Sequence, residues 1–172
     1  MATLEIIKYP APILRDKSQP VSQIDAAIQK LASDMLETMY SAPGVGLAAP
    51  QVGILKRLVV IDITSNPKER DPLVLINPRI IYTEGESTGE EGCLSIPEVY
   101  GDVHRFQTIR VKFLDLNGKE YEVTGENFLA RVIQHEVDHL DGIMFIDRMS
   151  KIKRDLLKIK MRKKAKLAAR ES

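Results

Sequence analysis

The stretch QHEVDH at residues 134–139 is the most informative part of this chain, because it places a H-E-x-x-H motif inside an apolar segment. Two histidines four positions apart lie on one face of a helix, so the imidazoles of His135 and His139 can bind one divalent metal ion. Glu136 follows the first histidine directly and suits a base that acts on water beside that metal. The motif predicts a metallohydrolase. A surface helix with two solvent-facing histidines is the alternative.

The composition is that of an ordinary globular protein. The 172 residues are 44% hydrophobic and 28% charged, and no apolar run approaches the ~20 residues that a membrane-spanning helix needs. The first 20 residues mix charges and prolines among apolar side chains, unlike a signal peptide. The single cysteine, Cys93, excludes an internal disulfide and fits a reducing compartment. We expect a cytoplasmic protein with no membrane and no DNA partner; a mature organellar form is the alternative.

Charge is distributed unevenly along the chain. Residues 151–172 hold ten lysines and arginines against two acidic residues, a net charge of +8, whereas the rest of the chain carries −7. Apolar residues at Met149, Ile152, Leu156 and Ile159 form a helical seam. We therefore expect residues 150–172 to form a basic C-terminal helix of a single domain that spans residues 1–172. Such a run of charge attracts RNA phosphate or serves only as a solvated surface.

The remaining chain mixes helical and strand patterns. Apolar residues at three- and four-residue spacing predict a helix over residues 22–40, with Ser22 as its N-cap. Pro78 separates two predicted strands, residues 85–92 have the composition of a loop, and Asn117-Gly118 predicts a hairpin. The predicted strands are apolar and β-branched and cover residues 57–64, 73–77, 79–84, 109–115 and 119–123.

These elements predict an α+β fold. The H-E-x-x-H helix, expected from about residue 126 to residue 140 and ending near Gly142, lies at its centre. Small antiparallel or mixed β-sheets surround that helix, and N-terminal and C-terminal helices complete the fold.

A catalytic site of this kind needs a third protein ligand and one open position. No glutamate downstream of His139 lies on a second, well-placed helix. Cys93 is the better candidate, because Gly92 permits close backbone approach and a thiolate binds Fe²⁺, Zn²⁺ or Ni²⁺. A buried structural cysteine is the alternative.

A glycine-rich stretch, GVGLAAPQVG at residues 44–53, adds hydrogen-bond donors. Its glycines leave backbone N–H groups approachable, and Gln51 offers a side-chain amide. Such groups can stabilise an oxyanion next to a metal. A structural turn after the preceding helix explains this stretch equally well.

Together the stretches GVGLAAPQVG, EGCLSIP and QHEVDHLDG resemble, in order and separation, the three signature motifs of the peptide deformylase family. The resemblance implies hydrolytic removal of formate from the N-terminal formyl-methionine of new polypeptides. It also implies that Cys93, His135 and His139 bind one divalent metal ion, most often Fe²⁺, with Zn²⁺ or Ni²⁺ able to replace it. Glu136 would be the general acid/base.

The same resemblance implies substrate and partner contacts. The Gln51 amide and the backbone N–H of Leu94 would bind the oxyanion, and Gly46 would meet the substrate main chain. The partners would be N-formyl-methionyl nascent peptides and, through the basic C-terminal helix, the ribosome.

A pocket for the methionine side chain needs flexible apolar walls. Val45, Phe128 and Val132 are candidates, because the last two share the helical face of the first motif histidine. A place in the core explains them equally well. Arg131 has no assigned role, and His104 is interpreted as a surface histidine.

Two other functions use the same residues. A zincin-like endopeptidase would cleave internal peptide bonds rather than release formate. An RNA- or ribosome-binding protein with a structural metal would close the coordination shell, whereas one cysteine and two histidines leave a position open.

Overall fold

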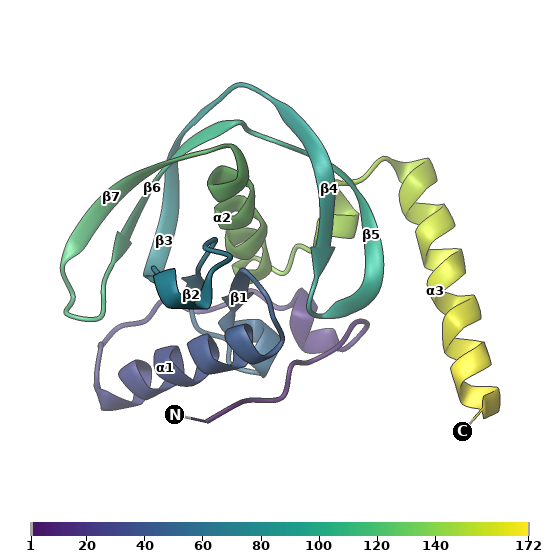
Figure 1. The fold of residues 1–172 in the computed structure, drawn as a ribbon, viewed down its shortest axis with the longest axis horizontal. Coiled ribbons are helices and arrows are strands. Elements are labelled where there is room, and N and C mark those ends of the chain that lie inside the picture. The colour runs from purple at the N-terminus through teal and green to yellow at the C-terminus, as the bar shows by residue number, and fades with distance from the viewer. Residues whose placement is uncertain (1, 172) are drawn as a thin grey trace.

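The structure is a computed structural model that describes residues 2–171 (Figure 1). Its α-helices are α1 (Ala26–Ser41), α2 (Asn127–Leu140) and α3 (Lys151–Glu171). Its strands are β1 (Gly46–Ala48), β2 (Leu58–Ile61), β3 (Leu73–Glu84), β4 (Ser87–Cys93), β5 (Ile96–Arg105), β6 (Thr108–Leu114) and β7 (Glu120–Glu126). Within the described range, no helix is both long enough and apolar enough to cross a bilayer.

Two antiparallel sheets surround α2, which confirms the predicted α+β class. Strands β1-β2-β3-β6-β7 form a five-stranded sheet in that order, and β4 pairs with β5 in a separate hairpin. Figure 1 shows α2 enclosed between the large sheet and this hairpin. The helix buries Ala130, Ile133 and Leu140 in a cluster with the apolar residues of the large sheet. The H-E-x-x-H motif therefore lies on the buried part of this helix, where its polar groups are removed from water.

Helix α1 begins later than the sequence predicts. Asp25 is its N-cap, and the Asp25 carboxylate accepts a hydrogen bond of 3.0 Å from the backbone N–H of Ile28. The prediction of Ser22 as N-cap was wrong. The error arose from Ile24, which packs against the core from the segment that precedes the helix. Its apolar side chain continues the helical spacing although the residue itself is not in the helix.

Strand β3 runs continuously through Pro78, so the prediction of two strands was wrong. The register with β6 shifts between Ile76 and Arg79, and Asn77 adopts a φ of 51° at this irregularity. The Asn77 side chain accepts a hydrogen bond from the N–H of Val21 and donates one to its carbonyl. A bulge tolerates proline because no ladder hydrogen bond is required from it.

The predicted loop over residues 85–92 is largely strand β4, and its partner β5 was not predicted. Strand β4 was not predicted because Glu91, its one buried residue, is charged rather than apolar. By contrast, the β6–β7 hairpin was predicted correctly, and Gly118 at its turn has a φ of 79°.

Helix α3 is formed as predicted, but of the predicted seam only Met149, just before the helix, is buried against the body. Leu157 and Met161 pack instead against the cluster that contains Val99 and Met149. Ile152, Leu156 and Ile159 are exposed. In Figure 1 the helix stands beside β5 at the edge of the molecule.

Candidate metal centre

Cys93, His135 and His139 converge on one point. Their ligand atoms all lie within 4.8 Å of one another, and Cys93 Sγ is 3.3 Å from His139 Nε2. The cysteine is brought there by the end of β4, where the hairpin register shifts next to Gly92. The two histidines come from adjacent turns of α2. A strand end and a helix face thus supply one cysteine sulfur and two imidazoles.

Glu91 fixes the orientation of the first imidazole. Its Oε1 lies 2.9 Å from His135 Nδ1, so that nitrogen carries the proton and Nε2 is left for the metal. Burial lowers the pKa of His139 well below its ordinary value, so this ring is neutral. Burial also lowers the pKa of His135, but hydrogen bonds to Cys93 and Glu91 raise it overall to about 10. A metal that binds His135 must therefore displace a proton. This donor set fits a divalent transition metal.

A buried ion cluster lies behind the ligands. Arg105 donates from Nε and Nη2 to the two oxygens of Glu91, each at 2.9 Å, and Arg131 donates from Nη1 at 2.7 Å. Arg105 also bonds Asp138 at 2.6 Å. Burial alone would raise the pKa of Glu91, but the hydrogen bonds from Arg105 and His135 lower it to about 2. Glu91 is therefore ionised, and each of its two oxygens accepts two hydrogen bonds.

Sequence reasoning missed this cluster. Glu91, Arg105 and Asp138 were assigned no role, and Arg131 was left without one. Two sequence spacings could have indicated the cluster. Glu91 lies two residues before Cys93 on one strand, and Arg131 lies one helical turn before the first motif histidine.

Glu136 lies beside the ligand atoms in a dry environment. Its side chain is part of a residue only 3% exposed, and Oε1 is 3.7 Å from His135 Nε2. Oε2 is buried and has no hydrogen-bond partner among the described residues. Burial, the largest cause, raises the pKa of Glu136 to about 7. A carboxyl with that pKa can accept and return a proton at neutral pH.

Gly46 makes room for this carboxylate. A Cβ added to Gly46 would lie 2.9 Å from Cγ of Glu136 and 3.0 Å from its carboxyl carbon. Strand β1 therefore approaches α2 as closely as a glycine allows.

Gln51 is buried next to the metal ligands. Its Nε2 lies 3.5 Å from Cys93 Sγ and 3.1 Å from Ser95 Oγ, while Oε1 accepts a 3.0 Å hydrogen bond from the N–H of Ala48. Leu94 follows Cys93 in the turn between β4 and β5, and its side chain lines the cavity described next.

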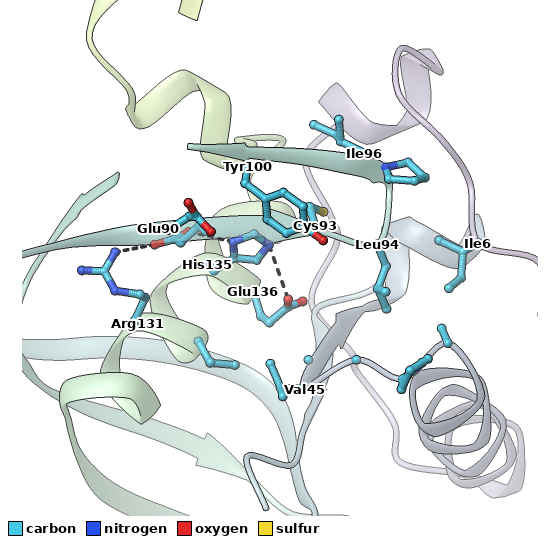
Figure 2. A pocket seen from close by; sticks show the side chains of 18 of the residues that line it. Ile6, Val45, Glu90, Cys93, Leu94, Ile96, Tyr100, Arg131, His135 and Glu136 are labelled. Carbon is cyan, nitrogen blue, oxygen red and sulfur yellow. Dashed lines mark hydrogen bonds and ion pairs between the residues drawn. The ribbon is translucent and has the colours of Figure 1, made fainter. Parts of the chain in front are cut away.

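A cavity of about 600 Å³ is lined by Cys93, His135 and Glu136, among other residues (Figure 2). Val45, Gly46, Phe128 and Val132, all predicted substrate contacts, line this cavity. Val132 is nearly buried, whereas Phe128 is half exposed at the rim. Residues from β1, β4 and α2 thus form walls on three sides of the site.

His104 lies outside this cavity. It is exposed, and its Nδ1 is 2.7 Å from Thr88 Oγ1 while its Nε2 is 3.4 Å from a Glu86 oxygen. It is a surface histidine on the outer face of the β4–β5 hairpin.

Comparison with known proteins agrees with this geometry. Residues 3–155 match the family model described as polypeptide deformylase. A peptide deformylase of Endomicrobium trichonymphae is 53% identical over 166 residues, which cover 96% of this chain and 98% of that protein. The crystal structure of a peptide deformylase from Legionella pneumophila has a TM-score of 0.89 and 46% identity, and covers 98% of this chain and 99% of its own.

A second solved structure is similar to the same extent. The peptide deformylase from Synechococcus elongatus, solved in complex with actinonin, has a TM-score of 0.89 and 43% identity over 94% of this chain and 89% of its own. Because these matches span nearly the whole chain, it belongs to the polypeptide deformylase family, whose metal-dependent enzymes remove the formyl group from the N-terminal formyl-methionine of polypeptides.

Proposed function

We propose that Cys93, His135 and His139 hold the metal of this deformylase and that Glu136 is its general acid/base. One observation carries the proposal: a buried carboxylate with a pKa near 7 and an unpartnered oxygen lies beside three converging ligand atoms. The thiolate-imidazole donor set suits Fe²⁺, which we propose as the native ion, and also Zn²⁺ or Ni²⁺.

When bound, a divalent ion supplies a Lewis acid that favours loss of a proton from water and polarises the formyl oxygen. Glu136 accepts that proton, and the C–N bond of the formamide breaks after water has added to the formyl carbon. Glu136 then returns the proton to the leaving amine, so formate and a free N-terminal methionine result. Burial keeps bulk water from exchanging this proton during the reaction.

Charge on the formyl oxygen needs donors that are already in place. We propose the Gln51 amide and the Leu94 backbone N–H for this task, each contributing about 3 kcal/mol in the transition state. The closeness of Gln51 Nε2 to Cys93 supports the first assignment. Gly46 would pair with the substrate main chain.

The methionine side chain would lie in the cavity of about 600 Å³. Val45, Phe128 and Val132 would form its apolar walls. The half-exposed ring of Phe128 would pack against the thioether, an S–aromatic contact that suits methionine.

We further propose that the protein is a single cytoplasmic domain whose α3 contacts ribosomal RNA. The net charge of +8 on residues 151–172 supports this proposal. Lys163→Glu combined with Lys166→Glu changes two exposed side chains of α3. Ribosome binding should weaken, and its affinity should depend less steeply on salt concentration, by the equivalent of about two phosphate contacts. Binding with an unchanged salt slope would contradict the proposal.

The metal is tested by purifying the protein without oxygen and measuring metal content and formate release on each fraction. We expect formate release to rise in proportion to iron, up to one ion per chain. A rate of formate release that follows zinc content instead would overturn the assignment of Fe²⁺, but it would leave the proposed ligands unchanged.

A further inference from the structure

A second groove lies between β5 and α3 and shares a wall with the catalytic cavity. Its volume is about 290 Å³, and Glu90 and Tyr100 line both spaces. Figure 2 shows these two side chains beside Cys93 and His135. The groove therefore adjoins the catalytic cavity, and these two side chains separate the two spaces.

Tyr100 forms the boundary between the two spaces. Its ring lies against the β4 backbone: a Cβ added to Gly92 would come within 2.6 Å of Tyr100 Cε1. The residue is nevertheless 61% exposed. A peptide that leaves the catalytic cavity can therefore cross the outer face of this ring without displacing it.

The groove is lined partly by charged residues, Glu90, Asp102, Lys153 and Lys160, and partly by apolar ones. Met149 forms part of it next to Gly101, where an added Cβ would lie 2.5 Å from the methionine Cε. Leu156 and Leu157 line it from α3. Leu157 also packs into the core, but Leu156 is 58% exposed, so apolar surface is open to a ligand here.

We propose that this groove binds an apolar side chain of the substrate polypeptide, downstream of its N-terminal methionine. The proposal rests on the deformylase function, because a polypeptide substrate continues beyond the catalytic cavity and must leave along its rim. The shared wall of Tyr100 and Glu90 places the groove next to the catalytic cavity, so we take the substrate itself as the occupant. Burying the exposed part of Leu156 against such a side chain favours peptides that carry it.

The chain offers a matched pair of leucines to test this groove. Leu156→Gln removes apolar surface inside it, whereas Leu167→Gln changes a residue of α3 that is 55% exposed and does not line it. Both substitutions lie on the surface of one helix, so neither should alter folding. Circular dichroism and metal content provide the check.

The substrates are formyl-Met-Ala-Ser and formylated octapeptides in which one leucine is moved through an alanine-serine background. We expect one leucine position to raise kcat/KM about three- to tenfold, a gain that Leu156→Gln abolishes and Leu167→Gln retains. The tripeptide should react equally with all three proteins. The absence of a preferred position, or a preference that Leu156→Gln leaves intact, would overturn the groove assignment. Failure to deformylate even the tripeptide would instead count against the proposed function.

Discussion

Glu91 Oε1 lies 2.9 Å from His135 Nδ1, and the same strand that carries Glu91 places Cys93 two residues further on. Residues two apart on a strand point to the same face. A single short strand therefore delivers one metal ligand and the group that orients another. The orienting carboxylate is held in turn by Arg105 and Arg131.

Replacing Glu91 should weaken the metal site and the fold together. Glu91→Gln leaves Arg131 without its buried counter-charge and Arg105 with Asp138 alone, which should cost about 3–5 kcal/mol of stability. Loss of the oriented imidazole should lower metal affinity about 10- to 100-fold. Chelator competition and urea unfolding measure the two effects. The control is Glu86→Gln, on an exposed residue just before β4, and equal chelator sensitivity in both variants would contradict the account.

The convergence of the two motif histidines could be predicted from the sequence because it is local. The spacing of His135 and His139 needs only the geometry of one helix. The cluster around Glu91 could not be predicted in the same way, since its partners lie 14, 40 and 44 residues away along the chain. Charged residues are usually exposed, so a strand with a buried carboxylate resembles a loop.

Gly46→Ala should impair catalysis without removing the metal. The added methyl group would come within 2.9 Å of the Glu136 side chain, so the carboxylate or strand β1 must move. A displacement of the base by a few tenths of an ångström or more should reduce kcat at least tenfold. Steady-state formate release and metal content provide the readouts.

Gly125→Ala is the matched control for this glycine. Its added methyl group would meet its nearest neighbours at 3.4 Å, near ordinary contact distance. It should change kcat little. A Gly46→Ala protein with wild-type kcat would show that close approach at β1 is not required.

Asp62 should make stability depend on acid pH. It accepts hydrogen bonds from Tyr40, Thr64 and Asp71. Burial acts to raise its pKa, but the hydrogen bonds lower the pKa below its ordinary value of 3.8. Its contribution is therefore complete above about pH 3.8 and is lost as pH falls through the lower, folded-state pKa.

Asp62→Asn should remove this pH dependence and cost about 1–3 kcal/mol at pH 7. Urea unfolding of both proteins from pH 7 down to pH 3 measures it. The difference in stability should shrink toward low pH. A difference that stays constant or grows over this range would contradict the assignment.

The fold was harder to predict at the boundaries of its elements than in its class. Ile24 packs on the core from outside α1, and β3 passes through Pro78 on a bulge. Both features depend on tertiary contacts that no local pattern contains. The H-E-x-x-H helix was predicted correctly because its helical pattern lies in one continuous segment.

The most direct test of the central claim is metal content and formate release measured together on anaerobically purified wild type and Glu136→Ala. The variant keeps Cys93, His135 and His139, so it should retain one divalent ion per chain. It should release formate at least 100-fold more slowly than the wild type, because the buried group that moves the proton is gone. A metal-loaded Glu136→Ala protein with near wild-type turnover would contradict the account.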